Sequence, residues 1–150
     1  MGQINCQDGM EMSLCVIDPE KKIIEYSGAM NPLYVVENNE ITVVKPDVQA
    51  IGGVRSLTRK SMEITFTDHT ISITKNMSLY LFTDGYLDQF GGQNNNKFNV
   101  AQFKRLILEI QSKNMDEQKE AIALAMKNWK GNYRQIDDML VMGVKLSNLF

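Results

Sequence analysis

A short apolar strand that ends on an acidic residue constrains the fold of this chain most strongly. Leu79 to Phe82 form an apolar run flanked by polar residues, a pattern typical of a buried strand. The run ends on Thr83-Asp84-Gly85, which predicts a carboxylate at the mouth of the sheet. Gly85 allows a tight reversal or a close backbone approach behind that carboxylate. Because Asp-Gly after a strand is also ordinary turn chemistry, Asp84 alone does not distinguish a turn from a site.

Alternating apolar residues predict most of the other strands. Alternation with a period of two predicts strands over residues 10–17, 62–67 and 139–146, and shorter apolar runs predict strands at 23–27, 33–36, 41–44 and 70–74. We expect 10–17 to place one face in a core and to pair with 23–27 as a hairpin. A turn at Asp68-His69 predicts a second hairpin between 62–67 and 70–74. Residues 45–61 show no period and are expected to form a loop.

Two amphipathic helices follow the acidic strand end. Asn99 is a good N-cap for a helix that runs to about Lys113, and Asp116 is the expected cap of a second helix that stops at Gly131. Trp129 falls on the apolar stripe of the second helix and is expected in the core. Consecutive hairpins and a separate C-terminal helix pair favour an α+β layered fold with largely antiparallel sheets over a parallel doubly wound one.

Length, charge and cysteine content exclude several classes of protein. A chain of 150 residues fits one domain, and a net charge of −2 with scattered basic residues argues against nucleic-acid binding. No apolar stretch approaches the roughly 18 residues that span a bilayer, and the start does not resemble a signal peptide, so we expect a cytoplasmic protein without membrane contact. Cys6 and Cys15 lack zinc-site spacing and are interpreted as small apolar side chains. His69, the only histidine, is interpreted as a turn residue.

The acidic strand end has a partner near the C-terminus. Asp137 and Asp138 open the last predicted strand, so Asp84 comes close to Asp137 if the two strands are antiparallel neighbours. Carboxylates without thiolate or imidazole groups suit Mg²⁺ or Mn²⁺. Adjacent residues of an extended chain point to opposite faces, so at most one of the two acids is a ligand. A calcium hand over Asp84 to Asp88 is excluded, because its spacing of oxygen ligands is absent.

These segments resemble the last two acidic motifs of the metal-dependent type 2C protein phosphatases, in the branch of stage II sporulation protein E. The resemblance covers nearly the whole chain. It rests on Leu79-Tyr-Leu-Phe-Thr-Asp-Gly-Tyr-Leu-Asp88 and Gln135-Ile-Asp-Asp-Met-Leu-Val-Met-Gly-Val144, and extends to Asp8-Gly9-Met10 running into Leu14 to Asp18, to Tyr26 to Tyr34, and to Ala50-Ile51-Gly52-Gly53. Ala50 stands where the family usually has proline.

The resemblance implies an α-β-β-α sandwich that hydrolyses phosphoserine or phosphothreonine at a two-metal centre of Mn²⁺ or Mg²⁺. It implies that Asp84 and Asp137 are metal ligands, each for a different ion. Thr83, Gly85 and Asp138 are the implied supporting residues. Asp88 matches a commonly acidic position that is not a core ligand, and it is interpreted as structural.

The chain departs from the family in its first half. The Gly-Asp and Asp-x-x-Gly-His-Gly motifs that supply the bridging aspartate do not occur in the sequence. We therefore expect residues 1–150 to be the C-terminal portion of a single phosphatase domain, with the sandwich incomplete, from a parent with an upstream sensor or signalling domain. Two metal ions repel without a bridging acid, so metal binding should be weak and the chain alone inactive. Uncovered sheet surfaces predict self-association.

The resemblance also implies a class of substrate. A phosphorylated regulatory protein is expected, since phosphatases of this branch commonly act on anti-sigma-factor antagonists. The alternative is a non-catalytic protein-interaction module, in which the two acids are turn residues. The Gly-Asp and Asp-x-x-Gly-His-Gly motifs upstream in the parent reading frame would favour the enzyme, and their absence there would favour the module.

Overall fold

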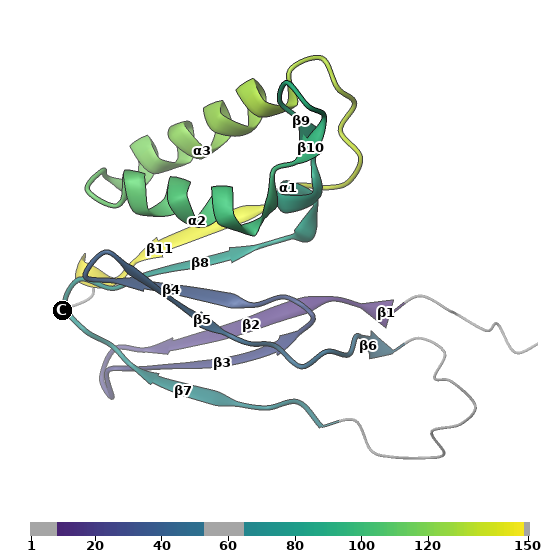
Figure 1. Cartoon of the computed structure of the whole chain (residues 1–150). Coiled ribbons are helices and arrows are strands. Elements are labelled where there is room, and N and C mark those ends of the chain that lie inside the picture. The colour runs from purple at the N-terminus through teal and green to yellow at the C-terminus, as the bar shows by residue number, and fades with distance from the viewer. Residues whose placement is uncertain (1–8, 53–64, 149–150) are drawn as a thin grey trace, which may run out of the picture. The chain divides into compact units, whose positions relative to one another are not determined.

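The two larger sheets of the chain belong to two different units. The computed structural model describes residues 9–52 and 65–148. The first unit comprises Met1–Leu33 with Val44–Ile73, and the second comprises Tyr34–Val43 with Thr74–Phe150. The elements of both units are labelled in Figure 1.

The first unit is built on a three-stranded antiparallel sheet. Strands β2 (Met12–Asp18) and β3 (Ile23–Ala29) pair as the predicted hairpin, with Met12 opposite Ala29. Strand β7 (His69–Ser72) pairs with the other side of β3. The two-residue strands β1 (Gly9–Met10) and β6 (Ile51–Gly52) form a separate antiparallel pair. Strand β6 therefore interrupts the loop that was predicted over residues 45–61. Residues 53–61 of that loop lie outside the described part.

The predicted hairpin between 62–67 and 70–74 is wrong in its described part. Residues 65–68 form no strand, residues 62–64 lie outside the described part, and β7 pairs with β3 instead. His69 lies in β7 rather than in a turn, opposite Tyr26, and the centroids of the two rings are 5.9 Å apart. Alternation of apolar residues predicts a strand, but it determines neither whether the strand forms nor which strand is its partner.

The apolar row of β2 is exposed. Met12, Leu14 and Val16 are 39, 54 and 48% exposed, whereas Cys15 and Ile17 are half-buried. Burial in this sheet concentrates on the central strand, where Ile24 and Tyr26 are at most 1% exposed. Alternation in β2 shows that its two faces differ, but it does not show which face is covered. The apolar face that was expected in a core is the exposed one in this edge strand.

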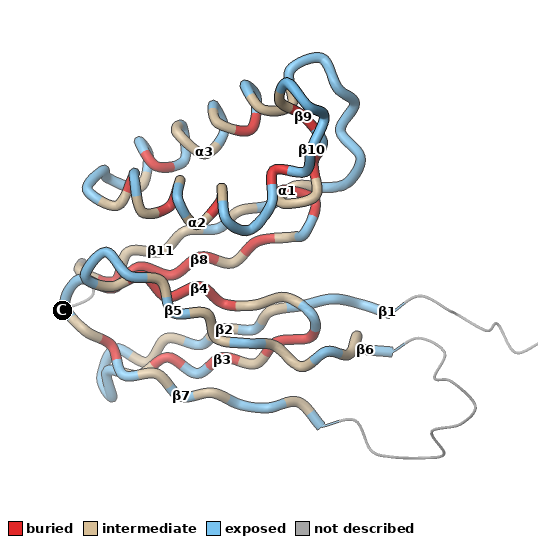
Figure 2. Tube along the Cα trace, viewed as in Figure 1, coloured by how far each residue is buried: buried red, intermediate tan, exposed pale blue. Residues whose placement is uncertain are grey.

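The second unit is built on a four-stranded sheet with the order β11-β8-β4-β5. Its strands are β4 (Leu33–Glu37), β5 (Glu40–Val44), β8 (Ser78–Phe82) and β11 (Val141–Lys145). Strand β8 lies inside the sheet and is antiparallel to both β11 and β4. Four of its five residues are buried, which confirms the central strand predicted from the sequence. The buried positions along β8 and β4 are visible in Figure 2.

Helices α2 (Asn99–Ile110) and α3 (Met115–Lys130) lie on one face of this sheet (Figure 1). The Asn99 side chain accepts hydrogen bonds from the Ala101 and Gln102 amides, as its predicted capping role requires. The cap of α3 is not Asp116, as predicted, but Asn114, which forms a capping box with Glu117. Asp116 lies in the first turn of the helix.

Smaller elements connect these parts of the second unit. Helix α1 (Asp84–Asp88) follows β8 directly, and strands β9 (Phe90–Gly91) and β10 (Asn96–Lys97) pair antiparallel before α2. A short 3₁₀ helix (Leu146–Asn148) follows β11.

The core of the second unit is aromatic. Phe82 of β8 packs edge-to-face on Tyr34 and on Phe103, each at 4.8 Å between ring centroids. Burying one such side chain contributes about 1.5–3 kcal/mol, so these contacts hold the helix layer on the sheet. Trp129 is half-buried, packs on Phe98 at 5.6 Å and donates Nε1–H to the Gln89 carbonyl oxygen at 3.1 Å, in agreement with its predicted core role.

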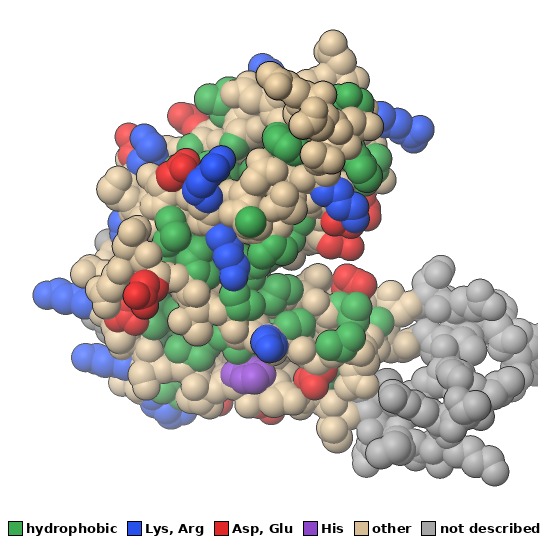
Figure 3. Space-filling model, viewed as in Figure 1, with side chains coloured by type: hydrophobic (Ala, Val, Ile, Leu, Met, Phe, Trp, Pro, Cys, Tyr) green, Lys and Arg blue, Asp and Glu red, His purple; other side chains and the backbone are tan. Residues whose placement is uncertain are grey.

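Two surface features bear on the class of protein. No helix within the described ranges is long and apolar enough to cross a membrane. On the face drawn in Figure 3, basic and acidic side chains are interspersed with apolar ones rather than gathered into one patch.

Candidate metal and phosphate site

The candidate site lies where β8 ends and β11 begins. The antiparallel register places Val141 opposite Phe82, so the residues after Phe82 run beside the residues before Val141. This pairing confirms that the two acidic strand ends are neighbours. Asp84 and Asp137 are therefore in adjacent segments, although 53 positions separate them in the sequence.

The Thr83 hydroxyl ties the two segments together. Its Oγ1 donates to the Asp138 carbonyl oxygen at 2.9 Å and accepts from the Leu140 amide at 2.9 Å, while the Thr83 amide donates to the Leu140 carbonyl oxygen at 3.0 Å. Three hydrogen bonds thus join one residue to the start of β11. A hydroxyl is needed here because only a group that both donates and accepts can make the first two bonds.

Gly85 brings the two acidic segments into close contact. A Cβ atom at this position would collide with the Asp138 carbonyl oxygen and would lie 3.1 Å from the Asp137 Cβ. Gly85 is buried, and its neighbour Asp84 is exposed at the start of α1. The close backbone approach that Asp84-Gly85 suggested is therefore present, between Gly85 and the Asp137-Asp138 segment. The chain then continues as the short helix α1.

Asp137 and Asp138 play different parts. The Asp137 Oδ1 accepts from the Asp138 amide at 2.7 Å, and its carbonyl oxygen accepts from Gln135 Nε2 at 2.8 Å. The Asp138 carbonyl oxygen accepts from Thr83. Both acidic residues are exposed, as is Asp84. The Asp138 backbone therefore anchors the segment.

Asp88 pairs with a lysine at the other end of α1. Its Oδ2 is 2.8 Å from Lys97 Nζ, and both side chains are nearly half-exposed. The pair links α1 to β10. This ion pair gives Asp88 a structural contact, in line with its interpretation as a structural residue.

Gln89 supports the site and was missed by reasoning from the sequence. It is fully buried, and its Nε2 donates to the Phe90 and Arg134 carbonyl oxygens at 2.9 and 3.0 Å. It thus connects the end of α1 to the segment that leads into Asp137. A lone glutamine after an acidic residue carries no periodic signal, so only the tertiary contacts reveal this role. Its Oε1 has no hydrogen-bond partner among the described residues.

The donor set fits one hard divalent ion better than two. Carboxylate oxygens suit Mg²⁺ or Mn²⁺, and Mg²⁺ is commonly held by one or two carboxylates together with substrate phosphates. Over residues 9–52 and 65–148, however, no group of three or more His, Cys, Asp or Glu side chains is placed to hold a metal ion. A pair of ions about 4 Å apart requires further acids to offset their repulsion, and these two carboxylates do not supply them.

Comparison with known proteins supports a single family. The family model described as stage II sporulation protein E (SpoIIE) matches residues 3–147. A comparison with curated proteins gave no significant match.

Several solved structures share the fold. The SiaA-PP2C domain of Pseudomonas aeruginosa is similar with a TM-score of 0.80 at 23% identity, and the match covers 90% of this chain and 51% of that one. The phosphatase domain of the cell fate determinant SpoIIE from Bacillus subtilis has a TM-score of 0.64 at 13% identity, covering 90% and 57%. The Mycobacterium tuberculosis serine/threonine phosphatase PstP/Ppp has a TM-score of 0.53 at 16% identity, covering 91% and 59%. The chain thus spans a little over half the length of each of these structures.

Proposed function

Because the chain belongs to the stage II sporulation protein E family, we propose that it forms the C-terminal part of a metal-dependent serine/threonine phosphatase domain. The complete domain hydrolyses phosphoserine or phosphothreonine on a regulatory protein, for which an anti-sigma-factor antagonist is the leading candidate class. One observation carries the proposal. Thr83 and Gly85 clamp the end of β8 onto the start of β11, which places Asp84 beside the Asp137 segment.

Asp84 and Asp137 are the residues that would hold Mn²⁺ or Mg²⁺. When bound, such ions lower the pKa of a coordinated water and neutralise charge on the phosphoryl oxygens. The task of this chain is to position its two carboxylates, with Thr83, Gly85 and the Asp138 backbone as positioning residues. Since both acids are exposed, they are accessible to a phosphoprotein substrate.

The remaining ligands come from the part of the domain that this chain does not match. The solved relatives are nearly twice as long as the region they share with it. We propose that this remainder, with an upstream sensor or signalling domain, is needed for activity. The chain alone should therefore show no hydrolysis of p-nitrophenyl phosphate with Mn²⁺ above background.

The decisive experiment uses a completed domain. The part of the SiaA domain outside the match is joined to this chain in the order found in the relative, and hydrolysis of a phosphoserine peptide is measured with and without Mn²⁺. Asp84→Asn and Asp137→Asn should each reduce the rate at least about a hundredfold, whereas Asp88→Asn should change it less than about threefold. Metal-independent hydrolysis, or equal effects of the three variants, would contradict the proposal.

A non-catalytic interaction module is the second candidate. It is favoured by the finding that, within the described part of the chain, no three His, Cys, Asp or Glu side chains are grouped so that they could hold a metal ion. In that case Asp84→Asn and Asp137→Asn would leave both metal affinity and phosphopeptide hydrolysis of the completed domain unchanged. Isothermal titration with Mn²⁺ separates the two candidates.

A further inference from the structure

We propose that a polar cavity at the start of β8 binds a small organic anion, a carboxylate or a phosphate ester, through Lys145 and the buried hydroxyl of Ser78. The cavity has a volume of about 470 Å³ and is lined by residues from the start of β8, the end of β11, the turn between β4 and β5 and the end of α2. All of these parts belong to the second unit. The proposal concerns binding alone and does not depend on the proposed phosphatase function.

A buried hydroxyl without a partner lines this cavity. Ser78 is 1% exposed, and its Oγ forms no hydrogen bond with any described residue. Side chains alternate along a strand, so Ser78 leaves β8 on the same face as Tyr80, which packs in the core beneath the helices. Leaving a buried hydroxyl unpaired costs stability, and such groups are rare in folded proteins. The Ser78 hydroxyl is therefore available to donate a hydrogen bond to a ligand.

Lys145 supplies a positive charge beside that hydroxyl. It is the residue of β11 directly opposite Ser78, so the two side chains leave the sheet on one face, with Cβ atoms about 4.5–5.5 Å apart. Lys145 is half-buried and belongs to none of the ion pairs of the described residues. An ammonium group in this position attracts an anion. Its stem is long and flexible, so it can move aside to admit the anion to the hydroxyl and then contact it.

The acidic residue of the cavity lining is engaged elsewhere. Val36 of β4 lies opposite Ser78, so the next residue, Glu37, directs its side chain to the other face of the sheet. There the Glu37 Oε1 accepts a hydrogen bond from the Thr74 hydroxyl at 2.6 Å. Its carboxylate therefore does not neutralise Lys145, and the cavity keeps a net positive charge.

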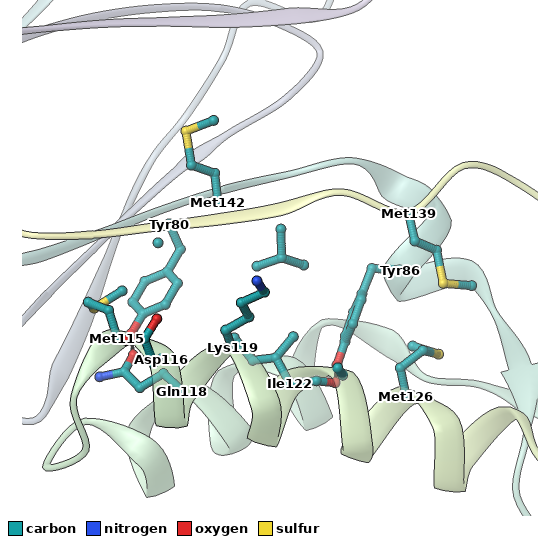
Figure 4. A pocket seen from close by; sticks show the side chains of 13 residues that line it. Tyr80, Tyr86, Met115, Asp116, Gln118, Lys119, Ile122, Met126, Met139 and Met142 are labelled. Carbon is teal, nitrogen blue, oxygen red and sulfur yellow. Dashed lines mark hydrogen bonds between the residues drawn. The ribbon is translucent and has the colours of Figure 1, made fainter.

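Gln111 at the end of α2 adds an acceptor. Its Nε2 donates to the Tyr80 hydroxyl at 2.7 Å and to the Ile107 carbonyl oxygen at 3.2 Å. Tyr80 donates in turn to Gln118, and both of these side chains are labelled in Figure 4. Because both amide hydrogens of Gln111 are engaged, its Oε1 remains as an acceptor for a hydroxyl group of the ligand.

The lining chemistry distinguishes this cavity from the groove between α3 and β11 in Figure 4, where methionine, isoleucine and valine side chains predominate. Four amide side chains and two serine hydroxyls line the cavity at the start of β8, with Val36 and Leu108 as its apolar members. No aromatic ring is among the described residues that line it. This argues against a nucleobase, since bases are commonly held by stacking on aromatic side chains.

The cavity and the candidate metal site lie at opposite ends of β8. Ser78 is the first residue of the strand, and Asp84 lies beyond its last. Five residues of a strand extend about 17 Å. A small anion beside Ser78 therefore does not reach Asp84, and the two sites are separate.

Isothermal titration of the metal-free chain with L-malate and with glycerol 3-phosphate tests the proposal, at an ionic strength held constant with NaCl. At least one of the two probes should bind at one site per chain with a Kd below about 1 mM. Binding of malate alone would identify a carboxylate ligand, and binding of glycerol 3-phosphate alone would identify a phosphate ester.

Two lysine substitutions locate the binding. Lys145→Gln removes the charge from the cavity and should weaken binding at least about tenfold, because a hydrogen bond from a charged donor is lost. Lys127→Gln is the matched control, since it removes the same charge from an exposed position of α3 outside the cavity. Its Kd should differ from that of the parent by less than about twofold.

Ser78→Ala tests the buried hydroxyl. The variant should bind the anion about threefold to tenfold more weakly, because one hydrogen bond to the ligand is lost. It should melt no lower than the parent when no anion is present, since the hydroxyl has no partner in the described part of the chain. A lower melting temperature would show that the hydroxyl is bonded within the protein, which would contradict the proposal.

Three results of the titrations would also overturn it. Neither probe binds with a Kd below about 1 mM; Lys145→Gln and Lys127→Gln weaken binding equally, as a general effect of charge would; or binding survives both Lys145→Gln and Ser78→Ala, which would place the anion elsewhere. None of these measurements involves hydrolysis, so failure of the proposed function would leave them unaffected.

Discussion

Thr83 and Gly85 hold together the two segments of the candidate site. The Thr83 hydroxyl makes two of the hydrogen bonds that join the end of β8 to the start of β11. Gly85 leaves the space in which the Asp138 carbonyl lies. Neither residue has a charge, yet together they determine where Asp84 and Asp137 lie.

The space at Gly85 leads to a prediction about stability. Gly85→Ala should lower the free energy of unfolding by about 1–3 kcal/mol, because the added methyl group collides with the Asp138 carbonyl oxygen. Urea denaturation followed by circular dichroism measures the loss. The amide resonances of Asp137 and Asp138 should move as well.

Gly131→Ala is the matched control. A methyl group there meets nothing within 4 Å, and only its φ of 52° makes alanine unfavourable, at about 1–2 kcal/mol. The resonances of Asp137 and Asp138 should therefore stay in place. Unchanged resonances in both variants would show that Gly85 is not a contact point.

At the scale of elements, helix α3 is tied both to α1, which begins at the candidate site, and to the interior strand β8. Its capping box fixes where it begins, the Tyr86 hydroxyl of α1 donates to the Ile122 carbonyl oxygen at 2.9 Å, and Tyr80 of β8 donates to Gln118 Oε1 at 2.5 Å. The helix is thus held by polar bonds at two points as well as by its apolar stripe. Loosening α3 would therefore disturb both α1 and β8.

Substitution of Asn114 and of Asp116, the observed and the predicted cap of α3, should lower stability by different amounts. Asn114→Ala should destabilise the protein by about 0.5–2 kcal/mol, since it removes the bond to the Glu117 amide. Asp116→Ala should cost less, about 0.3–1 kcal/mol, because its carboxylate acts only through the helix dipole. Thermal unfolding of the two variants ranks them. An Asp116→Ala loss as large as that of Asn114→Ala would contradict this assignment of the cap.

Buried tyrosines predict how stability depends on pH. Burial raises the pKa of Tyr86 above its ordinary value, and burial also raises the pKa of Tyr80. The unfolded chain therefore releases these protons first, so stability should be unaffected below about pH 9 and should fall as the pH rises past about 10. Urea midpoints between pH 8 and 11 measure the decline.

Tyr86→Phe provides the check on that prediction. The variant loses the hydrogen bond to Ile122 and should be less stable at every pH by about 1 kcal/mol. Its stability should nevertheless fall less steeply above pH 10, because one of the buried tyrosines whose pKa is raised is gone. A slope equal to that of the parent would exclude Tyr86 as a cause.

On the scale of the whole molecule, exposed apolar strand surface is the outstanding feature. The row formed by Met12, Leu14 and Val16 in β2 lies uncovered on an edge strand. Exposed apolar rows on strands favour association. The self-association expected from the sequence is therefore best tested at this row.

Leu14→Lys should shift the chain toward the monomer, because a charge in the middle of the row must be desolvated on association. Light scattering at several protein concentrations measures the change in mean mass. Thr42→Lys adds the same charge at an exposed position of β5, in the other sheet, and should leave the mass unchanged. A parent chain that is monomeric at all concentrations would contradict the expected self-association.

Sequence reasoning could predict what depends on local pattern. The apolar run at 79–82 identified β8 because a fully buried strand needs apolar residues on both faces. Asn99 marked a helix start because its side chain caps the first amides, and Gly131 marked a helix end because glycine adopts a positive φ without strain. Two acids at the ends of apolar strands also indicated where a metal site should be sought. Each of these inferences needs only residues close together in the chain.

Only the tertiary structure decided which segments are partners. Strand β7 joined β3 rather than residues 65–67, the apolar row of β2 stayed exposed, and Gln89 connected α1 to the segment before Asp137. The candidate site likewise depends on long-range pairing, since Thr83 and Asp138 meet across 55 positions. Alternation and capping are written into neighbouring residues, whereas strand partners and the choice of buried face depend on how apolar surfaces pack across the whole fold.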